Sequence, residues 1–348
     1  MSPLGTVKST VPMYATMNRV PGGAMLIPLI LGSIIGTFTP EALGIGSFTT
    51  ALFKESALPL IGLLIFATGM QITLRSSGAV LAHAGVILVG KSLIPAALVV
   101  ALGASLGKEG LFGVSLLALL VVVDNSNGGL WLAFTGKYGT KTDRGAYIAS
   151  AVNDGPFFTL VFLGASGLAD IPGILILAAV VPLILGMIVG NLDPHWTDVM
   201  RPTASIVIPF FAFALGAGID LRSIVIGGLP GLVVGAISSV ITGCIVYAGY
   251  RFLLRRGKMS GIGFAAGTTA GNAVATPAIV AQADPSFEPF VAAATAQVAA
   301  AVLVSSIVAP LMATWVLKRS GGLAQAQAEA DSEAGQPADL GVLIGEVS

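Results

Sequence analysis

Apolar runs long enough to cross a membrane recur along this chain from residue 24 to residue 317. A helix of about 20 apolar residues spans the roughly 30 Å hydrocarbon core of a bilayer. Lipid offers the backbone no hydrogen-bond partner, so each crossing has to satisfy its own N–H and C=O groups, as a helix does. The composition agrees, because 55% of the 348 residues are hydrophobic and 10% are charged, against about 25% charged in soluble domains. The sequence predicts an all-α integral membrane protein.

The apolar runs predict ten transmembrane helices. We place them at 24–39, 53–73, 79–106, 111–136, 144–167, 171–190, 203–220, 224–254, 260–283 and 287–317. Basic residues concentrate in the loops on one side of this arrangement, whereas the other side has Lys54, Lys108 and Arg222. By the positive-inside rule the basic side is cytoplasmic, which puts both the N- and C-termini there. Residues 1–20 lack the pattern of a cleaved signal peptide.

Two stretches of the first half recur in the second half. Residues 27–36 (IPLILGSIIG) resemble 181–190 (VPLILGMIVG), and residues 66–76 (FATGMQITLRS) resemble 213–223 (FALGAGIDLRS). The second match also aligns Asn125 with Asn272. Chance similarity between apolar segments is the alternative. Five spans per half would insert the second copy upside down, so we predict two inverted five-helix repeats.

This repeat sets the expected organisation of the chain. A cytoplasmic N-terminal segment (1–20) precedes the first five-helix repeat (21–170). The second, inverted repeat (171–318) is followed by a tail (319–348) rich in Ala, Gln, Glu and Gly, a composition that predicts disorder.

Two polar, glycine-containing stretches interrupt apolar runs, one in each half. Asp124-Asn125-Ser126-Asn127-Gly128-Gly129 breaks the fourth span, and residues 268–277 (TTAGNAVATP) break the ninth. Backbone groups freed at membrane depth cost several kcal/mol each unless protein or water satisfies them, so an interrupted span has to line a cavity. Paired broken helices in the two halves are typical of a transporter's binding site. We therefore expect the two breaks to meet and form that site.

Three charged residues lie within predicted spans and away from their ends, where a charge costs roughly 2.5–3.5 kcal/mol and points to function. Asp124 has to be paired, hydrated or protonated, and it is the first candidate for carrying a proton. Its structural alternative is a cap for the half-helix that begins at Gly128-Gly129. Asp154, in the kinked sequence Asn153-Asp154-Gly155-Pro156, is the second candidate, and pairing with Lys91 is its alternative. Lys91 either pairs with an Asp, attracts an anionic substrate or extends to the interface.

Uncharged polar residues at the breaks and the kink supply donors and acceptors that suit a hydroxylated ligand. The half-helix N-termini after each break favour the anionic end of such a ligand. The alternative for each residue is a polar contact between helices. The candidate substrate-binding residues are Asn125, Ser126, Asn127, Gly128, Gly129, Asn153, Thr268, Thr269, Asn272 and Thr276, together with Lys91.

Other classes of function find little support in the sequence. The 17 basic and 17 acidic residues balance, which leaves no basic surface for nucleic acid. The single Cys244 excludes an internal disulfide and a cysteine metal cluster. An intramembrane hydrolase is the rival from another class, but Ser166 lies at the end of a span and has no histidine in the same span to act as its base. We expect no catalytic residue, metal or cofactor.

Small-residue patterns predict close helix packing. Gly32-x-x-x-Gly36 and Gly186-x-x-x-Gly190 each present a glycine face on which another helix can approach. A homodimer is one use of such a face among others. The other expected partners are the lipid bilayer, a small-molecule sugar acid and a proton.

Five motifs resemble those of the 2-keto-3-deoxygluconate permease family. The resemblance covers nearly the whole chain from about residue 20 to 317. It rests on Val20-Pro21-Gly22-Gly23, Asp124 with Asn127-Gly128-Gly129-Leu130, Tyr138-Gly139-Thr140-Lys141, residues 208–216 (IPFFAFALG) and residues 273–277 (AVATP).

That family looks like a member of the bile acid/arsenite/riboflavin transporter superfamily. The resemblance implies broken fourth and ninth helices that cross, and a core domain (spans 3–5 and 8–10) that moves against a panel domain (spans 1, 2, 6 and 7). It also implies symport of 2-keto-3-deoxygluconate and a proton across a bacterial inner membrane. Permeases of this type tend to have an acidic residue where this chain has Asn153, which leaves the role of Asp154 open.

The choice of coupling ion has its own alternative. Sodium-coupled relatives carry a glutamate in the ninth span, and residues 261–282 contain none, so the resemblance favours proton coupling. The rival within transport is a sodium-coupled carrier of another organic anion, such as a bile acid or a keto acid. A channel is the third alternative.

Overall fold

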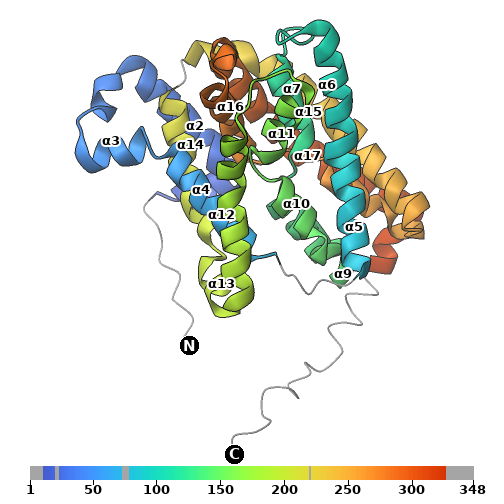
Figure 1. The fold of residues 1–348 in the computed structure, drawn as a ribbon. Coiled ribbons are helices and arrows are strands. Elements are labelled where there is room, and N and C mark those ends of the chain that lie inside the picture. The colour runs from blue at the N-terminus through green and yellow to red at the C-terminus, as the bar shows by residue number, and fades with distance from the viewer. Residues whose placement is uncertain (1–10, 20–22, 73–77, 219–220, 327–348) are drawn as a thin grey trace, which may run out of the picture.

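The computed structural model describes residues 11–19, 23–72, 78–218 and 221–326, and these residues are almost entirely helical (Figure 1). The first half contains α1 (Met13–Arg19), α2 (Gly23–Phe38), η1 (Pro40–Leu43), α3 (Ser47–Phe53), α4 (Ala57–Met70), α5 (Gly78–Leu88), η2 (Val89–Leu93), α6 (Ile94–Leu106), α7 (Leu116–Asp124), α8 (Gly128–Tyr138), α9 (Lys141–Gly145), α10 (Tyr147–Asn153) and α11 (Phe157–Ser166). The second half contains α12 (Gly173–Leu192), α13 (Pro194–Met200), α14 (Thr203–Ala217), α15 (Leu221–Ala248), η3 (Gly249–Leu253), η4 (Gly257–Ala266), η5 (Asn272–Ala275), α16 (Thr276–Ala283), η6 (Pro285–Phe290) and α17 (Val291–Ser320).

Every predicted span has a helical counterpart in the described part of the chain. Five segments are long and apolar enough to cross a membrane by themselves, and up to eight are if each of the bent pairs α3–α4, α9/α10–α11 and α13–α14 is one span. The two other predicted spans correspond to the 16-residue α2 and to the broken segment η4–η5–α16. The chain is therefore an all-helical, multi-pass membrane protein. The count of ten spans and the inverted orientation of the halves stay predictions.

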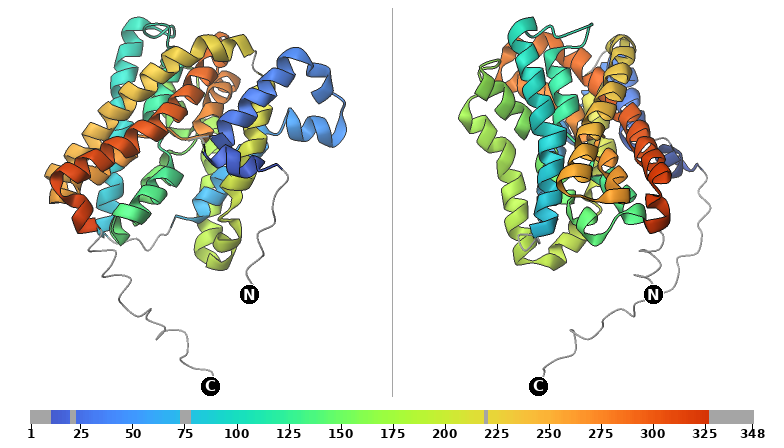
Figure 2. Two further views of the ribbon diagram at one scale, coloured as in Figure 1. Left: turned by 180° about the vertical axis from the view of Figure 1, so that it is seen from behind. Right: turned by 90° about the vertical axis from the view of Figure 1, so that its right-hand side faces the viewer.

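The helices form two groups, which Figures 1 and 2 show from three directions. In the first group, α2 packs on α14 and α4 packs on α12, and α13 continues this layer. In the second group, α15 lies along α17, and both pack on η4, while α7 packs against α6, α15 and α17. This division corresponds to the panel and core spans that the family resemblance implies.

Glycines let the helices of the first group touch backbone to backbone. A Cβ atom added at any of these glycines would collide with a carbonyl oxygen of the facing helix. The glycine and carbonyl pairs are Gly32 with Phe213, Gly36 with Ala217 and Gly216 with Leu29, and then Gly186 with Phe66, Gly190 with Met70 and Gly69 with Leu183. The second three pairs are the repeat equivalents of the first three. Both predicted glycine faces are thus used inside one chain, where they are not available for a homodimer.

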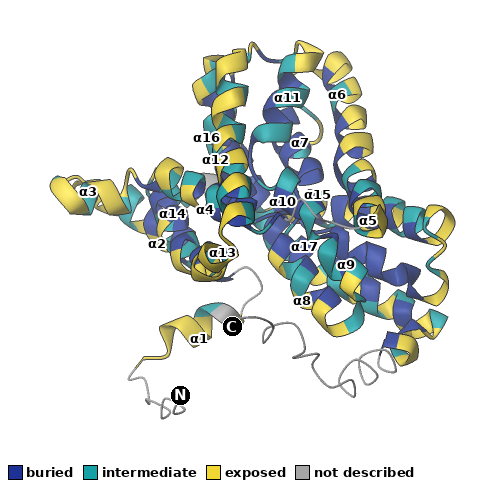
Figure 3. Cartoon of the chain, turned by 60° about the horizontal axis from the view of Figure 1, so that its bottom comes forward, coloured by how far each residue is buried: buried dark blue, intermediate teal, exposed yellow. Residues whose placement is uncertain are grey.

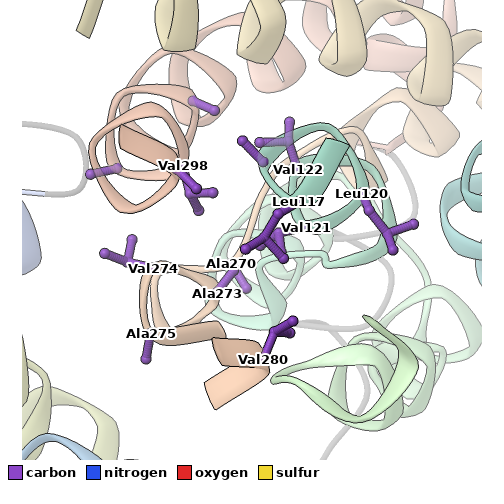
Figure 4. Close-up of a cluster of buried hydrophobic side chains, with 14 of the residues drawn as sticks. Leu117, Leu120, Val121, Val122, Ala270, Ala273, Val274, Ala275, Val280 and Val298 are labelled. Atoms are coloured by element: carbon purple, nitrogen blue, oxygen red, sulfur yellow. The ribbon is translucent and has the colours of Figure 1, made fainter. Parts of the chain in front are cut away.

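The apolar core joins the first break to the second. Leu117, Leu120 and Val121 of α7 are fully buried, and so are Val274 of η5 and Val298 of α17. These side chains belong to one buried cluster, and Figure 4 shows them on the three elements. The packing places the C-terminal end of α7 against the second broken segment, while the exposed residues face outward from the bundle (Figure 3).

The two ends of the molecule differ in charge. Arg144 lies in α9, Arg201 follows α13, and Arg256 forms an ion pair of 2.5 Å with Asp143 of α9. Both α9 and α13 lie at the lower end in Figure 1, and the last residue of α17, Ser320, hydrogen-bonds the carbonyl of Lys258 there. Lys108 lies at the opposite end, where it pairs with Asp284 at 3.8 Å. Arg144, Arg201 and Arg256 thus lie at one end, which we call the basic end, and its orientation in the membrane stays a prediction.

Both ends of the chain have ordered structure where they are described. The segment 1–20 contains the helix α1, and its residues 1–10 and 20 lie outside the described residues. At the C-terminal end, Leu323 and Ala326 pack against a buried apolar cluster, so the chain does not leave the fold at residue 319. Residues 327–348 of the predicted disordered tail lie outside the described residues, as does Arg75 of the repeat.

Candidate functional site

The two broken segments meet, as predicted. The backbone N–H of Asn127 donates a hydrogen bond of 3.1 Å to the hydroxyl of Thr268. In the other direction, the hydroxyl of Thr269 donates to the carbonyl of Val122 at 3.2 Å. Side chains of the second break therefore satisfy backbone groups that the first break leaves without a helical partner.

The first break begins after Asp124, the last residue of α7, and ends at Gly128, the first residue of α8. Asn125 and Asn127 have extended backbone conformations, and the Oδ1 atom of Asn127 accepts a hydrogen bond from Leu130 N at 3.0 Å. The residue that caps α8 is thus Asn127. The alternative that Asp124 caps the half-helix at Gly128-Gly129 is wrong, because Asp124 lies at the C-terminal end of the other half-helix.

Asp124 is completely buried in a dense set of polar groups. Its carboxylate accepts hydrogen bonds from Thr159 at 2.6 Å and from the side chain of Asn125, and its carbonyl accepts one from Ser92 at 2.7 Å. Lys91 donates from Nζ to the carbonyl of Val122 at 3.0 Å and is also fully buried. Lys91 therefore neither extends to the interface nor pairs with Asp154; Asp124 is the acid whose charge acts on it.

The remaining polar residues of the first break are also held internally. The Oδ1 atom of Asn125 accepts a bond of 3.0 Å from Gly155 N, just after the kink that separates α10 from α11 by 56°. The hydroxyl of Ser126 donates to Asn153 Oδ1 at 2.9 Å, and Asn153 Nδ2 donates to Ser92 at 2.9 Å. We call Lys91, Ser92, Asp124, Asn125, Ser126, Ser150, Asn153 and Thr159 the buried polar cluster.

The second break contains polar side chains with fewer partners. The backbone N–H of Thr269 donates to Ser305 at 3.0 Å, and Thr268 and Thr269 bond the first break as described above. Within the described part of the chain, both amide atoms of Asn272 and the hydroxyl of Thr276 have no hydrogen-bond partner, although both residues are buried. Buried polar groups without partners are rare in native structures, and a ligand or water that satisfies them is one explanation.

A cavity of about 1060 Å³ lies between the two helix groups. One wall comes from α2, α4, α12, α13 and α14, and the other comes from α8, α9, α10, η5 and α17. It extends from Asp198 and Arg201, which are exposed at the basic end, to Asp154 and Asn272 in the interior. Its size suits a small organic ligand, because such pockets usually measure about 300–1,000 Å³.

Asp154 is the acidic group in the interior of this cavity. It lies near Asn272, but its Oδ1 atom makes no hydrogen bond of regular geometry with any described residue. The ring of Tyr147 also lies beside Asp154, and it packs against Gly128 at the start of α8. Asp154, Asn272 and the beginning of α8 thus face one space.

The structure divides the predicted site residues into two sets. Those that line the cavity are Asn127, Gly128, Gly129, Asp154 and Asn272. Those that do not line it are Lys91, Asp124, Asn125, Ser126, Asn153, Thr268, Thr269 and Thr276.

Several polar residues of the cavity were not candidates from the sequence. They are Thr68, Gln71, Arg144, Tyr147, Asn191, Thr197, Asp198 and Arg201. Gln71 and Thr68 belong to the repeated motif at 66–76, which the sequence identified only as a repeat. Arg144 and Arg201 belong to the basic loops that predict the orientation of the chain, and no local pattern indicates that a basic loop residue lines a cavity.

Comparison with known proteins shows which family the chain belongs to. The family model described as 2-keto-3-deoxygluconate permease matches residues 14–322. 2-keto-3-deoxygluconate permease 1 of Salmonella typhimurium is 44% identical over 307 residues, which cover 87% of this chain and 95% of that protein. The permease of Bacillus subtilis is 39% identical over 311 residues (88% and 93%), and that of Xanthomonas euvesicatoria is 39% identical over 312 residues (88% and 97%). These proteins are named permeases, which makes them transporters rather than enzymes, and on this evidence the chain belongs to the 2-keto-3-deoxygluconate permease family.

Proposed function

We propose that this protein is a secondary carrier that imports 2-keto-3-deoxygluconate together with a proton across a bacterial inner membrane. The substrate comes from the names of its relatives. The observation that carries the proposal is the cavity between the two helix groups, which reaches both broken segments and has unpartnered polar groups in its interior.

The cavity offers separate partners for the two kinds of group on a sugar acid. Gly128 and Gly129 line it at the N-terminal end of α8, where the helix dipole and backbone N–H groups favour an anion. We assign the carboxylate of the substrate to this place. The side chains of Asn127, Asn272 and Gln71 supply donors and acceptors for its hydroxyl groups, and Arg144 and Arg201 attract the anion toward the opening.

Asp154 provides the coupling to protons in this proposal. A carboxylate inside the membrane without an ion pair is costly, and a proton removes its charge. The negative charge of Asp154 also repels the carboxylate of a substrate in the same cavity, where the low dielectric strengthens the repulsion. Protonation of Asp154 and binding of the anion therefore favour each other, which is the energetic condition for symport. Asp124 was the first candidate from the sequence, but Asp154 takes this role because it lines the cavity.

Alternating access follows from the division into two groups. The glycine contacts of α2 with α14 and of α4 with α12 hold one group together, and the packing of α7 on α17 and of the second break on α17 holds the other. The cavity opens at the basic end, which the positive-inside rule makes cytoplasmic. We assign the described conformation to the inward-facing state, with both termini in the cytoplasm.

Uptake into proteoliposomes with separately imposed gradients tests this function. We expect labelled 2-keto-3-deoxygluconate to accumulate when the outside is acidic, and a sodium gradient at constant pH to have no effect. Since an anion and a proton together carry no net charge, a membrane potential alone should not drive accumulation. Acceleration by sodium alone would contradict proton coupling and favour the sodium-coupled rival. Counterflow that saturates with substrate would exclude a channel.

A further inference from the structure

The ammonium group of Lys91 lies where the two broken segments meet. It is carried by the π-helical turn η2, and the residue is completely buried. Its Nζ atom donates to the carbonyl of Val122, which also accepts the hydroxyl of Thr269 from the second break. Val122 belongs to the last turn of α7, whose carbonyls have no partner within the helix. One positive charge thus lies at a point fixed by both halves of the molecule.

The surroundings of this ammonium have the chemistry of a site for a small cation. The C-terminal end of a helix has a partial negative charge, and Asp124 also acts electrostatically on Lys91. The carbonyl of Val122 accepts hydrogen bonds from both Lys91 Nζ and the hydroxyl of Thr269. Two residues further on, the carbonyl and the carboxylate of Asp124 accept hydrogen bonds from Ser92 and Thr159. Freed carbonyls and half-helix C-terminal ends hold Na⁺ in transporters with broken helices. In this chain the ammonium of Lys91 lies at such a helix end.

In the second half, neither Lys91 nor Asp124 has a charged equivalent. At the spacing that relates Phe66 to Phe213, Lys91 corresponds to Ser238 and Asp124 corresponds to Gly271. The second half thus lacks the ammonium and the carboxylate at once, and the hydroxyl of Ser238 has no hydrogen-bond partner among the described residues. The lysine and the aspartate thus occur together in the first half and are both replaced by uncharged residues in the second.

We propose that the ammonium of Lys91 is a tethered cation, which occupies a site at the end of α7 that would otherwise bind a monovalent metal ion such as Na⁺. It stabilises the crossing of the two breaks in every state of the carrier, because it cannot dissociate. This inference deepens the proposed function, since it explains how the breaks are held together without sodium. Its test, however, measures cation binding in the purified protein and does not depend on transport.

The experiment compares thermal unfolding of detergent-purified variants in sodium and in choline at equal ionic strength. Lys91→Ala removes the ammonium and leaves space beside the carbonyl of Val122. We expect this variant to unfold at a lower temperature than wild type in choline, and its Tm to rise saturably as Na⁺ replaces choline. Wild type and the matched control Lys137→Ala, which removes an exposed lysine, should show no difference between the two cations.

Two further variants separate a specific site from a general effect of salt. Lys91→Met removes the charge but fills the space with an apolar chain, so it should be destabilised and should not respond to Na⁺. Lys91→Ala combined with Asp124→Asn should lose most of the response, because the carboxylate is gone. A Tm of Lys91→Ala that is the same in sodium and choline would overturn the proposal, and so would an equal response of Lys91→Met.

Folding of Lys91→Ala is itself part of the test. If the variant is recovered folded only from membranes extracted in sodium medium, the result supports the tethered cation; recovery in neither medium contradicts it. Sodium-driven uptake by the wild type would refute the proposed proton coupling, yet the Tm comparison would still decide the role of Lys91.

Discussion

The two breaks of this molecule have aligned sequences but opposite degrees of polar satisfaction. In the first break, Asp124 and Asn125 bond to Thr159, Gly155 and each other, with Lys91 alongside. In the second break, both amide atoms of Asn272 lack a partner within the described chain. Asn125 and Asn272 are equivalent in the repeat, yet only Asn272 lines the cavity.

This difference indicates which polar groups stabilise the fold and which can bind a ligand. Polar groups that are already paired hold backbone in place, and a ligand would have to break those bonds to reach them. Groups without partners are free to bind a solute that enters. We infer that residues 124–126 of the first break are a rigid support, and that Asn272 of the second break, with Asp154 and the start of α8, recognises the substrate. The following changes test this division, from the largest expected effect to the smallest.

Removal of the charge of Asp124 should have the largest effect on stability. Asp124→Asn removes the charged acceptor of Thr159 and the negative charge that acts on Lys91, and the loss of a hydrogen bond to a charged group costs about 1.5–3 kcal/mol. Chemical denaturation in detergent measures the loss. The matched control is Asp198→Asn, in an ion pair with Arg201 that is largely exposed, where we expect about 0–1 kcal/mol. Equal losses in the two variants would contradict a supporting role for the first break.

The equivalent asparagines should respond differently to the same substitution. Asn125→Ala removes the acceptor of Gly155 N and leaves that buried N–H unpaired, which costs about 1–3 kcal/mol of unfolding free energy. Asn272→Ala removes no hydrogen bond of regular geometry, so its unfolding free energy should stay close to that of wild type. Measurement of both variants in the same detergent makes the comparison direct. A greater loss of stability in Asn272→Ala would reverse the assignment of the two breaks.

Transport by Asn272→Ala should be impaired, although its stability should stay close to that of wild type. Loss of one hydrogen bond to a substrate hydroxyl costs about 0.5–1.5 kcal/mol, which corresponds to a rise in KM of roughly 2- to 10-fold. The measurement is the concentration dependence of uptake by reconstituted Asn272→Ala. An unchanged KM would remove Asn272 from the substrate site, whatever its effect on stability.

The end of the molecule opposite the basic end should give the smallest effect. Hydrogen bonds from Ser286 hold the pKa of Asp284 below its usual range. Its contribution to stability is therefore present at neutral pH, above the unfolded pKa, and is lost as the pH falls through the lower folded pKa. Asp284→Asn should lower Tm slightly at pH 7 and should not differ from wild type once the acid is protonated. A difference in Tm that grows at acidic pH would contradict this assignment.

The architecture could be predicted from the sequence because lipid leaves few alternatives. Long apolar runs gave the positions of the helices, and glycines within polar stretches gave the two breaks and their meeting. The identity of the residues that face the cavity could not be predicted in the same way. Asp124 and Asp154 look alike in sequence, and their different environments depend on the kink at Gly155, which turns Asn153 inward and leaves Asp154 in the cavity.

The cavity residues Arg144 and Arg201 show a second limit. Each lies in a loop or a short helix whose basic character serves to orient the chain in the membrane. Whether such a residue also lines a ligand cavity depends on the packing of α9 against one helix group and of α13 against the other. No local pattern in the sequence indicates how α9 and α13 pack relative to each other.

The most direct test of the account is proton-driven uptake by Asp154→Asn in proteoliposomes. Asparagine keeps the shape of the side chain but cannot exchange a proton, so we predict that an acidic outside no longer drives accumulation of 2-keto-3-deoxygluconate, while counterflow of labelled substrate persists. Accumulation by Asp154→Asn at the wild-type level under the same pH gradient would contradict the role of Asp154 and, with it, the proposal that coupling takes place in this cavity.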